Sequence, residues 1–151
     1  MRTNDNLRAE YLLIQGQYEA YDQRALSLKA LATPLLGAGL AFGFKEHSLF
    51  ILTATAVLAA ALWYLEALWK SFQYCFTDRI KLIEGWFRGE GSDELPPFQV
   101  FSAFGEVYHR HYKHQANLLP ISRLPFVFLP YAPIVALGIL GDLVILFRRL
   151  V

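Results

Sequence analysis

The chain has 151 residues, of which 55% are hydrophobic, 15% aromatic and only 18% charged, and its mean hydropathy is +0.31. Soluble domains carry nearer 25% charged residues, and a chain this apolar buries enough surface on folding to exclude disorder. Fourteen basic and thirteen acidic residues leave a net charge of +1, which excludes a nucleic-acid-binding surface, and the single cysteine excludes a disulfide framework or a cysteine-rich zinc site.

Residues 1–24 are polar and charged, without the short apolar core of a secretory signal. Apolar and aromatic side chains recur there every three or four residues, at Leu7, Tyr11, Ile14, Tyr18 and Tyr21. This spacing predicts an amphipathic helix. We expect it either to lie on the membrane surface or to pack against the helix that follows the two apolar stretches described next.

Two apolar stretches follow, 25–44 and 48–65, and they are separated only by residues 45–47. A helix rises about 1.5 Å per residue, so roughly 20 residues cross a hydrocarbon core about 30 Å thick. The stretches therefore predict a transmembrane hairpin over 25–65, in which Lys29 extends its ammonium group to the interface. Buried helices of a soluble bundle are disfavoured, because such helices normally carry a polar face.

The distribution of basic residues predicts the orientation of this hairpin. The tip of the hairpin carries only Lys45, whereas the two flanking segments carry most of the lysines and arginines. Loops rich in these residues stay in the cytoplasm. We therefore expect the N-terminus and the segment 66–123 to lie on the cytoplasmic side of the inner (cytoplasmic) membrane.

The cytoplasmic segment 66–123 is predicted to be helical. The apolar stripe of the second span continues without interruption, so 48–88 is predicted to be one long helix. A Gly- and Pro-rich linker at 89–97 ends it, with Gly89 in the position after the helix cap, and a further helix is expected over about 98–117. Four aromatic residues of the segment are expected to be exposed: Phe72, Phe76, Trp86 and Phe87.

The last segment, 124–151, is again apolar, and it contains three prolines: Pro125, Pro130 and Pro133. Pro125 suits the first turn of a helix, and the other two are expected to break or kink it. A full crossing is favoured, although it places Arg148 and Arg149 outside, against the charge bias. The alternative is a re-entrant or interfacial segment.

Glu66 and Asp142 are the charged residues nearest to the apolar interior of the predicted membrane spans. Acidic residues within membrane spans mark functional sites by default, because burying one unpaired is costly. Glu66 lies one turn before Lys70, and such a pair accounts for it without a function. Asp142 either lines a pore or pairs with a terminal arginine. Together with Thr53 and Thr55, these two acids are the candidate pore-lining or pairing residues.

Small residues in the hairpin predict close helix packing. The first span contains Gly37, Gly39 and Gly43, and the second contains Ala56 and Ala60. Small residues four apart form a groove in which two helices approach closely. These residues are expected to pack the hairpin on itself or, alternatively, to form the contact between copies of the chain.

The sequence contains no recognisable catalytic motif, and we expect no enzyme activity, cofactor or metal. The histidines cluster at His109, His111 and His114, and Glu106 with His109 makes a Glu-x-x-His pair. A metal site built on this pair would need ligands from other chains, since no second copy of it exists. A basic face paired through Glu106 and Arg110 is the preferred interpretation.

The order of these parts resembles the SLATT family of small bacterial membrane proteins. The similarity covers residues 7–89: the N-terminal aromatic stripe, the two-span hairpin and the stretch LWYLEALWKSFQYCFTDRIKLIEGWFRG after it. The resemblance implies a membrane pore that acts as an effector in nucleotide-signalled or antiphage defence systems.

Two functions remain open. The first is a homo-oligomeric pore or channel, because three spans cannot enclose an aqueous lumen without further copies. The second is a non-conducting membrane anchor or accessory subunit whose segment 66–123 docks a cytoplasmic protein. The lipid bilayer is the expected partner in both cases, and a nucleic acid in neither.

Overall fold

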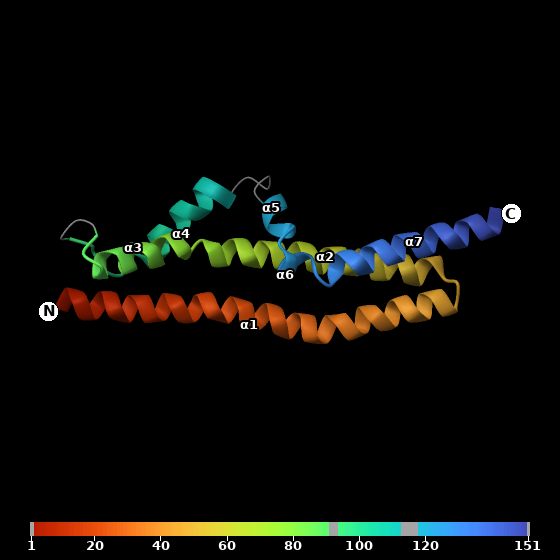
Figure 1. Cartoon of the computed structure of the whole chain (residues 1–151), viewed down its shortest axis with the longest axis horizontal. Coiled ribbons are helices and arrows are strands. Elements are labelled where there is room, and N and C mark those ends of the chain that lie inside the picture. The colour runs from red at the N-terminus through yellow and green to blue at the C-terminus, as the bar shows by residue number, and fades with distance from the viewer. Residues whose placement is uncertain (1, 91–93, 113–117, 151) are drawn as a thin grey trace. The chain divides into compact units, whose positions relative to one another are not determined.

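The computed structural model describes residues 2–90, 94–112 and 118–150, and within these ranges the protein is all-α, as predicted (Figure 1). In chain order the elements are α1 (Arg2–Lys45), α2 (Leu49–Tyr74), α3 (Thr77–Phe87), α4 (Val100–Val107), the π-helical turn η1 (Tyr108–Tyr112), α5 (Leu118–Ser122), α6 (Pro125–Phe128) and α7 (Tyr131–Leu150). The chain packs as two compact units. Unit 1 comprises Met1–Arg24 and Leu68–Leu119, and unit 2 comprises Ala25–Ala67 and Pro120–Val151.

Three helical stretches are long and apolar enough to cross a membrane: Asn4–Lys45, Leu49–Phe87 and Tyr131–Leu150. Of the apolar window within each, only 11%, 28% and 28% respectively is buried by the protein itself. Soluble domains rarely expose apolar surface on this scale, so lipid or further protein must cover it. These stretches support membrane association by their length and composition.

A tight turn joins α1 to α2 within unit 2. The backbone N–H of Ser48 donates to the carbonyl of Gly43 over 3.0 Å, and His47 adopts a left-handed conformation with φ of 47°. Histidine enters this region more readily than most residues, which allows the chain to reverse without glycine. The Ser48 hydroxyl then accepts from the N–H of Ile51 at 3.4 Å and caps the start of α2.

The core of unit 2 joins α7 to the α1–α2 hairpin. Its buried members come from all three helices: Ala32, Leu36, Leu40, Leu52, Ala59, Tyr131, Ile134 and Ile145. Packing of this kind stabilises helices in water and drives the association of helices in lipid. The C-terminal helix is therefore an integral part of unit 2.

The core of unit 1 joins the start of α1 to α3. Leu7 and Ile14 are buried against Ile80 and Ile83, and Tyr11 and Tyr18 pack at their edge. The aromatic stripe of the N-terminal segment therefore packs on the helix that follows the hairpin. This is the second of the two arrangements that the sequence left open.

The expectation of one uninterrupted helix over 48–88 differs from the structure at Cys75 and Phe76, which interrupt the α-helical hydrogen-bond pattern between α2 and α3. Phe76 keeps right-handed helical dihedral angles, so Leu49–Phe87 still forms one long helical stretch. The N–H groups of Cys75 and Phe76 donate to carbonyls three residues back, over 3.2 Å in each case. The Ser71 hydroxyl donates to the Leu68 carbonyl and the Cys75 thiol to the Ser71 carbonyl. Such side-chain bonds compete with the helical backbone pattern and favour the interruption.

The end of α3 is as predicted. Gly89 has a φ of 77°, its N–H donates to the Trp86 carbonyl, and the N–H of Glu90 donates to the Gly85 carbonyl at 2.8 Å. This pair of bonds is the Schellman arrangement that glycine makes accessible after a helix. Residues 91–93 of the predicted linker lie outside the described residues.

The next helix differs in part from the expectation of 98–117. It begins as α4 at Val100, because Phe98 has a φ of 64° and cannot be part of a right-handed helix. It continues into η1 through Tyr112. Residues 113–117, which include His114, lie outside the described residues.

The apolar segment at the C-terminus is divided into two helices. Pro125 occupies the first turn of α6, as predicted, and Leu129 and Pro130 end this short helix. Pro133 lies in the first turn of α7, where a missing N–H costs nothing, and does not break it. The candidate span is therefore Tyr131–Leu150.

The expectation that the aromatic residues of 66–123 are exposed is wrong for three of the four. Phe72, Phe76 and Trp86 are half-buried in unit 1, and only Phe87, at 47%, is exposed. Phe76 packs against the rings of Tyr21 and Phe104, with centroids 6.2 and 5.1 Å away. These side chains build the core of unit 1.

Candidate functional site

Two glycines of α7 allow it to approach α2 closely in unit 2. A Cβ atom added at Gly138 would lie 2.9 Å from the Ala56 Cβ and 3.3 Å from the Leu52 carbonyl oxygen. One added at Gly141 would lie 2.6 Å from the Phe44 ring and 2.9 Å from a Leu52 methyl group. Such contacts are far shorter than normal, so a Cβ at Gly138 would push the backbones of α7 and α2 apart, whereas one at Gly141 would displace the side chains of Phe44 and Leu52.

This close approach brings two of the predicted site residues together. Asp142 follows Gly141, Thr53 follows Leu52, and the Thr53 hydroxyl donates to Asp142 Oδ2 over 2.7 Å. Asp142 Oδ1 is buried and has no hydrogen-bond partner among the residues that the structure describes. Thr53 itself is exposed. The result is a polar pair between two apolar helices, in which the threonine is exposed and the aspartate is half-buried.

The other predicted threonine has a different environment. Thr55 is buried, at 8% exposure, and its hydroxyl donates to the carbonyl of Ile51 over 2.8 Å. A Cβ atom at Gly39 would lie 2.5 Å from this hydroxyl oxygen, and one at Gly43 would lie 2.7 Å from a Leu52 methyl group. These two glycines pack α1 on α2 within one chain, and Thr55 lies inside that contact.

The remaining small residues are divided between the interior and the surface. Ala56 contacts Gly138 of α7, whereas Ala60 is exposed and Ala59 takes the buried position beside it. In the described part of the chain nothing lies within 4 Å of a Cβ added at Gly37. Gly37 and Ala60 are therefore free to contact lipid or another protein.

A buried ion pair holds the opposite end of unit 2. Lys29 Nζ lies 2.6 Å from Glu66 Oε1, the two side chains are 18% and 5% exposed, and the ammonium also donates to the Phe126 carbonyl. Tyr131 adds its ring 6.0 Å from the ammonium. The pair links α1, α2 and the segment before α7, so Glu66 acts as a packing residue within one chain.

No family model, curated protein or solved structure matches the chain. The similarity of residues 7–89 to the SLATT family stays a prediction.

Unit 1 contains a buried ion pair that the sequence pattern did not reveal. Arg79 Nε and Nη2 donate to the two carboxylate oxygens of Glu10 over 2.8 and 3.0 Å, and the side chains are 4% and 1% exposed. Arg79 also donates to the Pro96 carbonyl, and Glu10 accepts from the Phe98 N–H over 2.6 Å. The pair ties α1, α3 and the 96–98 segment together. Its members are 69 residues apart, so spacing along the chain gives no signal.

A cavity of about 340 Å³ lies between α1, α2, α3 and η1 in unit 1. It is lined by Tyr18, Tyr74, Thr77, Asp78, Val107, His111 and Tyr112. Burial, followed by the negative charge of nearby acidic groups, raises the pKa of Tyr112, which therefore stays protonated near neutral pH. Most of the residues that line the cavity are polar.

The predicted histidine cluster is only partly within the described residues. His109 and His111 lie in η1, and Glu106 pairs with Arg110 over 3.9 Å on the exposed face, as predicted. Across residues 2–90, 94–112 and 118–150, no three His, Cys, Asp or Glu side chains come together in a group able to hold a metal.

Proposed function

We propose that the chain assembles with copies of itself into a membrane pore and that Asp142 carboxylates form a ring near one mouth of this pore. The observation that carries the proposal is the hydrogen bond from the exposed Thr53 to the half-buried carboxylate of Asp142, between two apolar helices. Rings of carboxylates are a common way to favour cations in a channel. The expected activity is cation-selective conduction.

The surroundings of Thr53 support a lumen-facing position. Phe50 and Val57 lie one turn away on α2 and are 81% and 63% exposed, and Leu143 of α7 is 57% exposed. Lipid would cover these three side chains favourably, but it would leave the carboxylate of Asp142 without water. Water in a lumen, or a donor from a second chain, resolves this conflict.

The position of the pair along the helices supports a place near the hairpin-tip end. Asp142 precedes Arg148 by about 9 Å along α7, and Thr53 follows Leu49 by about 6 Å along α2. Both groups are therefore within reach of the interface beside the hairpin turn. Positive-inside bias makes this the outer face, with the N-terminus in the cytoplasm.

The resemblance of residues 7–89 to SLATT proteins supports a role for the pore as an effector in bacterial antiphage defence. In such a role, conduction would depolarise the inner membrane of an infected cell. Unit 1, on the cytoplasmic side in this orientation, is where a signal would act. No catalytic step is part of this proposal.

The substitution Asp142→Asn tests the pore. We expect the purified protein to conduct ions across liposomes, with a cation-to-anion permeability ratio several times higher than that of the variant. Asparagine keeps the shape and the bond to Thr53 while removing the charge that attracts cations. The measurement is the reversal potential under a KCl gradient.

The matched control is Glu46→Gln, which removes the same charge from the exposed turn at the same end of the hairpin. It should leave the reversal potential nearly unchanged, because an exposed charge beside the mouth is screened by salt. Equal reversal potentials for wild type and Asp142→Asn would exclude Asp142 from the pathway. An absence of conduction by the wild-type protein would exclude the pore.

A second candidate function, a non-conducting anchor, is favoured by a different observation in unit 1. Phe98 and Phe101 are 67% and 89% exposed, and Phe98 holds its positive φ while its N–H binds the carboxylate of Glu10. Strained backbone of this kind is retained where surrounding structure enforces it, often at binding sites. The two rings would dock a cytoplasmic protein.

The size of the protein in mild detergent distinguishes the two functions. A discrete oligomer favours the pore. A monomer that co-purifies with a second protein, and loses it on Phe101→Ala, favours the anchor. Phe101 contributes little to folding because it is almost fully exposed, so this substitution should leave the fold intact.

A further inference from the structure

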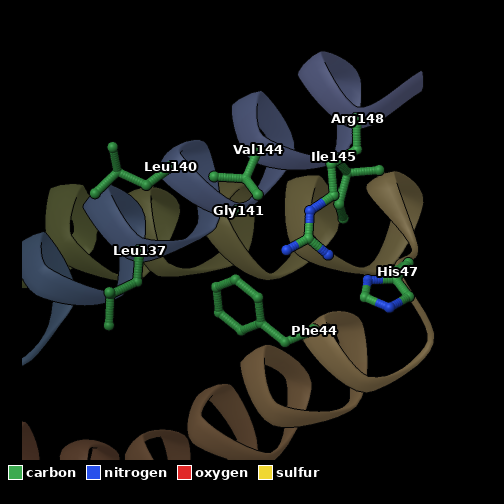
Figure 2. Close-up of a pocket in the computed structure, with 8 residues that line it drawn as sticks. All are labelled: Phe44, His47, Leu137, Leu140, Gly141, Val144, Ile145 and Arg148. Carbon is green, nitrogen blue, oxygen red and sulfur yellow. The ribbon is translucent and has the colours of Figure 1, made fainter. Parts of the chain in front are cut away.

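An apolar groove lies between α7 and the end of α1 in unit 2. It has a volume of about 290 Å³ and is lined by Phe44, His47, Leu137, Leu140, Gly141, Val144, Ile145 and Arg148 (Figure 2). Three of its walls, Leu137, Leu140 and Val144, are 47%, 57% and 53% exposed. Its long axis follows α7, a candidate membrane span. The groove is therefore open towards whatever surrounds this helix.

Basic groups gather at one end of the groove. Arg148 extends its guanidinium back towards Phe44, and the His47 ring lies nearby on the hairpin turn (Figure 2). A smaller adjoining cavity of about 200 Å³ is lined by His47, Ile145, Arg148 and Arg149. Within the described ranges no carboxylate forms an ion pair with either arginine. Among the described residues, positive charge therefore gathers without an ion-pair partner where the apolar walls end.

We propose that this groove binds an anionic phospholipid, with an acyl chain along Leu137, Leu140 and Val144 and the phosphate between Arg148 and His47. Guanidinium groups bind phosphate through paired hydrogen bonds, and basic pockets between membrane helices are known to hold lipid headgroups. The volume is at the small end for ligand pockets, which suits a segment of one chain.

The apolar side chains that line the groove favour a lipid over a soluble anion as its ligand. A free phosphate would use only the basic end and would leave the apolar walls without a partner. A lipid satisfies both ends at once, because its chain contacts the leucines and its headgroup lies at the level of the hairpin turn. A full crossing by α7 places Arg148 and Arg149 on the side of the membrane that normally carries few basic residues. The negative charge of the lipid would compensate their positive charge there.

The experiment measures lipids bound to the intact protein by native mass spectrometry after titration in mild detergent. Phosphatidylglycerol should bind about tenfold more tightly than phosphatidylcholine with the same chains. Arg148→Gln should weaken phosphatidylglycerol binding about fivefold, as expected for one basic contact. Lys45→Gln is the matched control, because it removes one charge from the same end outside the groove and should change little.

A second pair of variants tests the apolar part of the site. Val144→Trp fills the groove and should abolish binding of the lipid, whereas Leu143→Trp adds the same bulk to an exposed position next to it and should not. Equal affinity for the two lipids, or wild-type affinity in Arg148→Gln or Val144→Trp, would overturn the inference. So would inorganic phosphate competing at millimolar concentration. None of these outcomes depends on whether the protein conducts ions.

Discussion

Replacing Glu10 by alanine is expected to destabilise unit 1 by about 3 to 5 kcal/mol, the usual cost of removing one partner from a buried ion pair. The substitution leaves the Arg79 guanidinium, only 4% exposed, without its carboxylate. It also removes the acceptor of the Phe98 N–H, which lies 2.6 Å from Glu10. Unlike a surface pair, this one has no water to replace the lost contacts.

Hydrogen exchange is the measurement that localises this loss. Amide protection should fall over 4–24 and 77–87, the parts of α1 and α3 that the pair joins, while the α1–α2 turn of unit 2 keeps its protection. The melting temperature should fall by roughly 6 to 20 °C for a chain of this length.

Two variants separate this explanation from a general effect of mutation. Arg88→Ala breaks an exposed pair with Glu90 and should produce no measurable loss. The double variant Glu10→Leu/Arg79→Met replaces both charges by apolar side chains of similar size and should recover most of the stability. A single Glu10→Ala variant as stable as wild type would show that the pair does not hold unit 1 together.

The class of fold was predictable from the sequence because it depends on local composition. Long uncharged stretches specify helices of membrane-spanning length, and some Gly and Pro residues mark a helix end through their own backbone preferences. Gly89 is one example, since its positive φ and its two backbone bonds are those expected after a helix. Pro125 in the first turn of α6 is another.

The contacts between distant segments were not predictable in the same way. The bond between Thr53 and Asp142 joins residues 89 apart, and it depends on Gly138 and Gly141 allowing α7 to approach α2. Periodicity indicates that a residue lies on an apolar face, but it does not indicate which helix covers that face. For this reason the spacing along the chain indicates Lys70, one turn away, as a partner of Glu66 but gives no sign of the ion pair with Lys29 of α1.

The interruption at Cys75 and Phe76 was predictable neither from local composition nor from the apolar pattern. No Gly or Pro marks it, and the apolar stripe runs on through it. Side-chain hydrogen bonds from Ser71 and Cys75 to nearby carbonyls accompany it and compete with the helical backbone pattern. The spacing of apolar residues predicts which side chains are buried more reliably than it predicts where a helix is interrupted.

Replacing Gly138 by leucine is expected to separate α7 from the hairpin. Its Cβ alone would meet the Cβ of Ala56 at 2.9 Å and the Leu52 carbonyl at 3.3 Å, both attached directly to the backbone of α2. A side chain cannot rotate away from such atoms, so the helices must move apart at a cost of about 3 kcal/mol. Hydrogen exchange across α7 should rise, and the Thr53–Asp142 bond should be lost.

The series Gly138→Leu, Gly141→Ala and Gly37→Leu then tests whether packing causes this effect. At Gly141 the neighbours are the flexible side chains of Phe44 and Leu52, so alanine should cost less. At Gly37 the described structure leaves open space, and leucine should leave the fold of the single chain unchanged. An equal loss at all three positions would point to helix propensity instead of helix contact. If Asp142 selects cations only when Thr53 holds it, Gly138→Leu should also shift the reversal potential as Asp142→Asn does, while Gly37→Leu should not.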